Sequence, residues 1–427
     1  MTGDIHAEHR HKLRFLLRSA AALASTSIVT AGLGFVYWAV AARAFPATAV
    51  GESSTAITAM SLIAPLTVLG FGTLLLAELP TMREGRSTLL ATAAFLTGGA
   101  AVGVSLLCAF ALPSDFLGLP GIGTRPAVAL IFAAAVATQC VGLLFDQALL
   151  SLVGGGMQLR RNLVQAVVKL VLLVVFALTL ARFGALAIFT SWLLANIASL
   201  AVAIVLMMRR YRVPLRRLIP APAVLHGLHF DAARHHILNI ALFVPYFAMP
   251  IVANVVLGSR EAAYFYAAWS VASFVFFLPM SLSTALFASG ARDSSTVAME
   301  FRKTLRYSLL ACTAANIGVL VLGRPVLHIF GAAYAADGYQ PLIVLCLGGL
   351  GLVIKDHHVT LARLTDNVGR EAVLVGAFSI VEVAGAAVGA TRGGLTGLTL
   401  GWFAAVCVGA VVYSPRVWQA YRGRVHV

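Results

Sequence analysis

The sequence contains few charged residues and very few acidic ones. Only 11% of its residues are Asp, Glu, Lys or Arg, and only 16 of its 427 residues are Asp or Glu. A soluble domain carries about 25% charged residues. Hydrophobic residues make up 60% of the chain. These proportions exclude a large water-exposed domain and predict an integral membrane protein.

Motifs that would indicate an enzyme or a bound metal are also missing. Neither a catalytic triad nor a paired-carboxylate cleft is visible, and the four lysines lie outside any GxxxxGK[ST] phosphate-binding loop. Without CxxC or Cys/His spacing, the five cysteines are expected to be small core residues: they are Cys108, Cys140, Cys312, Cys346 and Cys407. We therefore expect neither catalysis nor a cofactor or metal.

Apolar runs long enough to cross a bilayer are abundant. A span needs about 20 apolar residues, and lipid-exposed backbone must satisfy its own hydrogen bonds, so each run is expected to be a helix. The first run is too long for a cleaved signal peptide, whose apolar region has about 7–15 residues. Twelve runs qualify, near residues 20–42, 54–78, 88–112, 127–152, 163–181, 186–208, 237–257, 263–288, 307–323, 340–356, 372–390 and 396–413.

The chain has a net charge of +15, and the distribution of its basic residues follows the order of these runs. The basic residues are not clustered as they would be on a nucleic-acid-binding face. Lys and Arg are concentrated in the N-terminal segment, the even-numbered loops and the C-terminal tail. Each odd-numbered loop holds a single Arg. Because basic loops stay in the cytoplasm, this alternation predicts twelve spans with both termini cytoplasmic.

The longest basic loop divides the chain into two sets of six spans. We expect a six-helix lobe over residues 1–208, a cytoplasmic linker over 209–236 and a second lobe over 237–427. The linker arginines either set the topology or bind anionic lipid headgroups. Pro65 and Pro279 lie in the second run of each half, which is a weak sign of a parallel repeat. This arrangement suits alternating access around a central cavity.

Two charges lie inside apolar runs on either side of the Gly154–Gly156 turn. Asp146 and Lys169 are each about six residues from the expected helix ends, or roughly 9 Å below the interface. An unpaired charge at that depth costs about 2.5–3.5 kcal/mol, so we expect an ion pair. Lys169 would hold an anionic substrate while Asp146 positions it or exchanges a proton. Two alternatives remain open: the pair only joins two helices, or Asp146 pairs with Arg160 or Arg161.

Other polar and helix-bending residues are candidates as well. Glu382 lies within the eleventh run with no obvious partner, and an ionisable residue there is a functional candidate. Asn254 is either a cavity donor or an interhelix hydrogen-bonding group, as are Asn196 and Asn316. The opening run of each half contains helix-bending residues, which are hinge candidates or positions of static bending: Gly32, Gly34, Pro245 and Pro250.

Three stretches together resemble a known transporter family. They are "WAVAARAFPATAVGESSTAITAM", "LLSLVGGGMQLRRNLVQAVVKLVLL" and "RPVLHIFGAAYAADGYQPLIVLCLGGL". In this order and spacing the chain resembles the polysaccharide-biosynthesis flippases of the multidrug/oligosaccharidyl-lipid/polysaccharide exporter superfamily. The resemblance implies an all-α membrane protein of about 12 helices in two six-helix lobes, the MATE-like exporter fold. It makes Arg43, Arg161 and Lys169 cavity candidates. Glu78 departs from the basic residue that the family often has before "LP".

The resemblance also implies a function and partners. Such proteins move undecaprenyl-diphosphate-linked oligosaccharides from the inner to the outer leaflet of the bacterial plasma membrane. A hydrated cleft is needed because stripping water from a diphosphate-sugar headgroup is prohibitive. Expected partners are the lipid-linked oligosaccharide, membrane lipid and polysaccharide polymerase or glycosyltransferases, with no nucleic acid and a monomeric chain. The alternatives are a cation-coupled multidrug exporter and a non-transporting partner of polysaccharide assembly enzymes.

Overall fold

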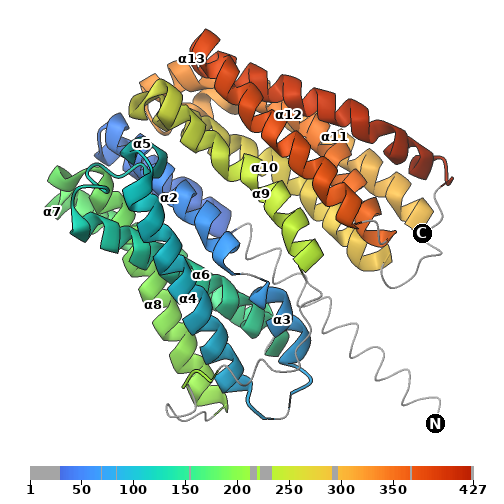
Figure 1. Ribbon diagram of the computed structural model, residues 1–427. Helices are drawn as coiled ribbons and strands as arrows, with labels where there is room; N and C mark the ends of the chain where they lie inside the picture. Colours follow the sequence, from blue (N-terminus) through green and yellow to red (C-terminus); the bar gives the residue numbers. More distant parts are fainter. Residues whose placement is uncertain are drawn as a thin grey trace. The chain divides into compact units, whose positions relative to one another are not determined.

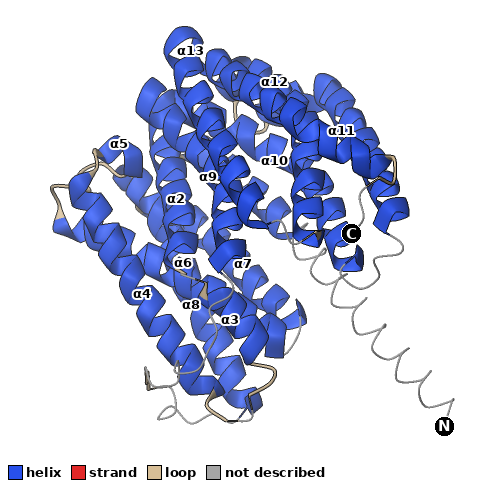
Figure 2. Ribbon diagram, turned by 45° about the vertical axis from the view of Figure 1, so that its right-hand side comes forward, coloured by secondary structure: helices blue, strands red, loops and turns tan. Residues whose placement is uncertain are grey.

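The computed structural model describes residues 29–68, 70–82, 84–152, 155–211, 219–221, 233–290, 297–365 and 368–424. Helices account for the regular structure in these ranges, which contain no strand (Figures 1 and 2). Nine of the helices are long and apolar enough to cross a membrane, and the helix Val29–Ala44 is shorter but also apolar. The expected all-helical membrane protein is therefore observed.

The chain folds into two compact units, and each combines segments that are distant in sequence. Unit 1 comprises Met1–Ala41, Ile63–Leu112 and Gly121–Ala233, and unit 2 comprises Ala42–Leu62, Pro113–Pro120 and Arg234–Val427. Most of the expected linker 209–236 lies outside the described residues. The division into lobes of residues 1–208 and 237–427 stays a prediction.

Unit 1 is built mainly from long helices that pack side by side. α4 packs against α6, α6 against α8, and α7 against α8, while the short α3 packs on α6. The elements are α3 (Phe71–Glu78), α4 (Arg86–Ala111), α6 (Pro126–Leu152), α7 (Gly155–Thr179), the 3₁₀ turn η1 (Ala181–Phe183) and α8 (Ala185–Tyr211).

The second expected span, 54–78, is two helices rather than one. α2 (Ala47–Thr67) ends before Gly70, and α3 begins at Phe71. Gly70 has φ 81°, in the left-handed region that glycine adopts without steric cost. The apolar run continues through this break, so hydropathy alone could not locate it.

Unit 2 is organised around α12 (Ala332–Leu364). This helix packs against α10 (Ser259–Gly290), α11 (Val297–His328) and α13 (Val368–Tyr421), which Figure 1 shows side by side. α9 (Ala233–Leu257) and the short α5 (Ser114–Leu117) also belong to this unit. α11 exposes many large apolar side chains, including Leu310 and Val321, as expected of a lipid-facing helix.

The last two expected spans form a hairpin within α13. Helical geometry stops at Gly393 and Gly394, and Gly394 has φ 59°. The two arms approach so closely that a Cβ atom added to Gly389 would lie 2.0 Å from the carbonyl oxygen of Gly397. Only glycine fits at this crossing. All twelve expected runs therefore overlap described helices, with α13 accounting for two of them.

The helix-bending candidates lie within continuous helices. Gly32 and Gly34 lie in Val29–Ala44, and Pro245 and Pro250 lie in α9. Proline removes the hydrogen bond to the carbonyl four residues earlier, which for Pro245 is that of Ala241. The hydroxyl of Ser379 on α13 donates to this carbonyl oxygen. A neighbouring helix thus satisfies the group that Pro245 leaves free, as membrane helices require. Whether these positions act as hinges stays a prediction.

Candidate functional site

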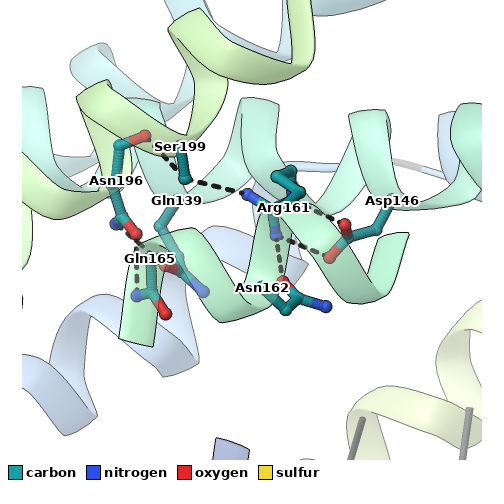
Figure 3. Close-up of polar contacts among 7 residues, drawn as sticks. All are labelled: Gln139, Asp146, Arg161, Asn162, Gln165, Asn196 and Ser199. Atoms are coloured by element: carbon teal, nitrogen blue, oxygen red, sulfur yellow. Dashed lines mark hydrogen bonds and ion pairs between the residues drawn. The ribbon is translucent and has the colours of Figure 1, made fainter. Parts of the chain in front are cut away.

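Asp146 and Arg161 form a bidentate ion pair between α6 and α7. Arg161 Nε donates to Asp146 Oδ1 and Arg161 Nη2 donates to Asp146 Oδ2, both at 2.7 Å (Figure 3). Both side chains are buried. A Cβ atom at Gly142 would lie 3.0 Å from Arg161 Nη1, so this glycine makes room for the guanidinium. Parallel charge-assisted bonds of this kind are strong and fix the geometry of both partners.

The expected ion pair between Asp146 and Lys169 is wrong. α7 begins at Gly155, well before the expected start near residue 163. Arg161 is therefore six residues into α7, just as Asp146 is six residues from the end of α6 at Leu152. At about 1.5 Å per residue, this places the two residues at the same level. Lys169 lies about two helical turns deeper. The alternative pairing of Asp146 with Arg161 is the one observed.

Lys169 is held by aromatic rings instead of a carboxylate. Its Nζ lies 3.8 Å from the centre of the Trp192 ring and 5.3 Å from that of Tyr37. The side chain is buried, and no carboxylate pairs with it in the described part of the chain. A cation over an aromatic face gains about 2 kcal/mol when it is desolvated. Among the described residues, the Lys169 ammonium group thus lies inside unit 1 without an acidic partner.

A chain of neutral polar groups continues from the ion pair. Gln165 Nε2 donates to Asn196 Oδ1 at 3.1 Å, and Asn196 Nδ2 donates to Gln139 Oε1 at 3.0 Å (Figure 3). Arg161 Nη1 donates to the hydroxyl oxygen of Ser199 at 3.5 Å, and this hydroxyl donates to the backbone carbonyl of Asn196. Ser199 therefore links the ion pair to the chain of neutral groups. These bonds connect α6, α7 and α8. Asn196 is therefore an interhelix hydrogen-bonding residue, as one of the two sequence interpretations proposed.

Unit 2 contains a cavity of about 430 Å³ between α9, α10, α12 and α13. We call it the unit 2 cavity. Aromatic side chains form much of its wall, and the Trp269 and Trp402 rings meet edge to face at 5.7 Å. Four charged side chains also line it: Lys355, Asp356, Arg363 and Glu382. Aromatic surface with a few convergent polar groups is typical of a small-molecule site.

Glu382 has a partner that the sequence did not reveal. Its Oε1 accepts a hydrogen bond from Lys355 Nζ at 2.7 Å, and both side chains are buried. Arg363 donates to Asn239 Oδ1 at 2.9 Å. Asp356 is half-buried and makes no ion pair with any described residue. Among the described residues, the cavity therefore offers a carboxylate without an ion pair, on which the charges of Lys355 and Arg363 act from nearby.

Arg363 was missed as a site residue because the tenth expected span ends at residue 356, and Lys355 and Asp356 were missed because they lie at that expected end. α12 continues to Leu364, so all three lie within the helix. The stretch "KDHHVTLARL" contains no Gly or Pro that would end a helix. The absence of Gly and Pro indicates that the helix continues through this stretch. The charged residues in it instead suggested a cytoplasmic loop.

The remaining candidates have structural contacts within unit 2. Arg43 donates to the backbone carbonyls of His328 and Ile329, at 2.6 and 2.9 Å, at the C-terminal end of α11. Cations stabilise helix C-termini in this way. Asn254 Nδ2 donates to the carbonyl oxygen of Asp115 at 2.6 Å and so joins α9 to α5. A substrate role for either residue stays a prediction. No group of three or more His, Cys, Asp or Glu residues that could hold a metal occurs in the described ranges.

Comparison with known proteins gives matches in structure alone. No family model and no curated sequence matches the chain. A multidrug resistance MATE family transporter of the MOP superfamily, in an inward-facing conformation, superposes with a TM-score of 0.64 at 15% identity, over 92% of this chain and 96% of the other. The chain has the fold of MOP-superfamily transporters. This confirms the expected MATE-like exporter fold.

Two further structures share this MATE-like fold. The lipid II flippase MurJ, in an inward closed conformation, has a TM-score of 0.68 at 12% identity over 94% of this chain and 90% of its own. A MOP superfamily transporter from Pyrococcus furiosus has a TM-score of 0.65 at 14% identity over 94% and 96%. Because one fold carries both drug transporters and a lipid flippase, the substrate must be argued from the side chains.

Proposed function

We propose that the protein is a flippase that moves an undecaprenyl-diphosphate-linked oligosaccharide from the inner to the outer leaflet of the bacterial plasma membrane by alternating access. Both termini lie in the cytoplasm in this proposal, the chain works as a monomer, and polysaccharide polymerase or glycosyltransferases act beside it. The MATE-like fold, which the lipid II flippase MurJ shares, is compatible with such a substrate.

Lys169 carries the proposal. An ammonium buried among aromatic rings, with no carboxylate partner among the described residues, suits an anionic diphosphate better than a cationic drug. Trp192 and Tyr37 add apolar ring surface beside it. Outward movement of an anion is also favoured by the inside-negative potential, by about 4–5 kcal/mol per 100 mV for two charges.

A translocation assay on the full-length protein tests this proposal. Proteoliposomes would carry fluorescent undecaprenyl-diphosphate oligosaccharide, and a membrane-impermeant reductant would report the label in the outer leaflet. We expect the wild type to exchange label between leaflets, Lys169→Met to be at least about tenfold slower, and the charge-preserving Lys169→Arg to retain most of the rate. Wild-type vesicles no faster than protein-free vesicles would refute the function. Equal rates for wild type and Lys169→Met, with unchanged thermal stability, would remove Lys169 from the mechanism.

One observation favours the alternative of a cation-coupled multidrug exporter. Asp356 presents a carboxylate without an ion-pair partner among described residues to an aromatic cavity, which suits an organic cation. Uptake of a fluorescent cationic dye into inverted vesicles distinguishes the two functions. Dye transport that Asp356→Asn abolishes, without oligosaccharide exchange, would establish the exporter.

A further inference from the structure

A groove with an apolar floor and a basic rim lies between α11 and the C-terminal arm of α13. We call it the α11–α13 groove. It encloses about 600 Å³, and Leu305, Leu309, Ile354 and Val417 line it together with Trp418 and Tyr421. It is separate from the unit 2 cavity and shares none of its lining residues.

The rim of the α11–α13 groove carries arginines that no carboxylate neutralises among the described residues. Arg306 donates from Nε and Nη2 to the hydroxyl of Tyr421, at 2.9 and 2.6 Å. Arg422 lies 4.8 Å from the centre of the Trp418 ring. The Arg302 guanidinium also reaches this end, because a Cβ atom at Gly423 would lie 3.8 Å from its Nη2. Arg302, Arg306 and Arg422 are all exposed.

The aromatic pair of the groove has the character of a membrane interface. The Trp418 and Tyr421 rings stack with centres 5.5 Å apart and planes within 5° of parallel. Trp and Tyr gather where hydrocarbon meets headgroups. Beyond them α11 exposes Tyr307 and Leu310, which continue the apolar surface into the expected lipid-facing part of the helix. The charge pattern of the sequence places this end on the cytoplasmic side, where anionic lipids meet basic segments.

We propose that the α11–α13 groove binds an anionic phospholipid of the inner leaflet. The phosphate of a lipid such as phosphatidylglycerol accepts hydrogen bonds from Arg302 and Arg306, which match phosphate geometry. One acyl chain lies along Leu305, Leu309 and Ile354. A soluble anion would leave this floor exposed to water, and a zwitterionic lipid would leave the arginines without a net counter-charge. Charge and apolar surface together select the lipid.

Quenching of Trp418 fluorescence by brominated lipid measures occupancy in the full-length protein. The signal from the groove is the part of the quenching that disappears in Trp418→Phe. In phosphatidylcholine vesicles, we expect brominated phosphatidylglycerol to quench at a lower mole fraction than brominated phosphatidylcholine. High salt should weaken the preference in the unmodified protein, because exposed charges are screened.

Paired variants test the arginine rim. Arg302→Gln/Arg306→Gln should need about 25-fold more phosphatidylglycerol, at about fivefold for each arginine. Arg160→Gln/Arg370→Gln removes two exposed arginines elsewhere and should leave quenching unchanged. Equal quenching by both lipids, or equal loss in both double variants, would overturn the proposal. Displacement of phosphatidylglycerol by undecaprenyl diphosphate at much lower concentration would also overturn it and make the groove an entry site for substrate.

Discussion

Nζ of Lys355 lies 2.7 Å from Oε1 of Glu382. This ion pair joins α12 to α13 at the wall of the unit 2 cavity. Both side chains are buried, so each depends on the other for charge compensation. Replacing a buried pair with apolar residues is often neutral, whereas removing one partner leaves a buried charge and costs about 3–5 kcal/mol. Comparing variants that remove one partner with a variant that removes both therefore distinguishes a pair that only holds two helices together from a pair that acts in transport.

We expect Glu382→Gln and Lys355→Met each to lower the free energy of unfolding by about 3 kcal/mol. The double variant Lys355→Met/Glu382→Leu should recover most of that loss, because neither member of the pair is then left as an uncompensated buried charge. Thermal unfolding in detergent measures stability, and the translocation assay measures activity on the same samples. If the double variant is stable and fully active, the pair only holds the helices together. If it is stable and inactive, the charges act in transport.

Arg161 should tolerate no other cation. Its guanidinium makes two parallel bonds to Asp146 and a further bond to Asn162 at 2.8 Å, which one ammonium cannot reproduce. We expect Arg161→Lys to lose about 2 kcal/mol of stability and Arg161→Ala at least about 3 kcal/mol. Arg160→Ala is the matched control because that neighbouring side chain is exposed. A fully stable Arg161→Lys would show that the bidentate geometry is dispensable.

The sequence predicted the number and kind of helices well, because the required length of an apolar run is a local property. Each of the twelve expected runs overlaps a described helix, and Lys169 was correctly placed inside one. The break at Gly70 escaped prediction because the hydropathy stays high through it. The end of α12 was also missed, because the helix continues through charged residues beyond the expected end at residue 356, as at Arg363.

Charge pairing could not be predicted to the same degree. A three-residue run of glycine left the start of α7 undetermined, and a shift of about eight residues exchanged Arg161 for Lys169 as the partner of Asp146. Glu382 and Lys355 lie 27 residues apart on different helices, so their contact depends on how those helices pack. Identifying the partner of a buried charge therefore requires coordinates, whereas the presence of the buried charge can be predicted from the sequence.

Asp356 should behave differently from Glu382 when it is neutralised. Its side chain lines the unit 2 cavity without an ion pair in the described structure. The two cations that act on its charge, Lys355 and Arg363, keep Glu382 and Asn239 as partners in Asp356→Asn. We expect a change in unfolding free energy below about 1 kcal/mol. A loss of transport with unchanged thermal stability would assign the carboxylate a role in binding or coupling. A loss of stability as large as that of Glu382→Gln would instead reveal a structural contact.

Ser379 should matter only while Pro245 is present. Its hydroxyl donates to the Ala241 carbonyl oxygen, the acceptor that Pro245 leaves without its helical donor. Ser379→Ala should therefore cost about 1–2 kcal/mol, because a buried carbonyl loses its partner. With Pro245→Ala the backbone N–H returns, and Ser379→Ala should then cost less than about 0.5 kcal/mol. Thermal unfolding of the wild type, both single variants and the double variant gives this coupling directly. Equal costs in the two backgrounds would show that the hydroxyl does not compensate for the proline.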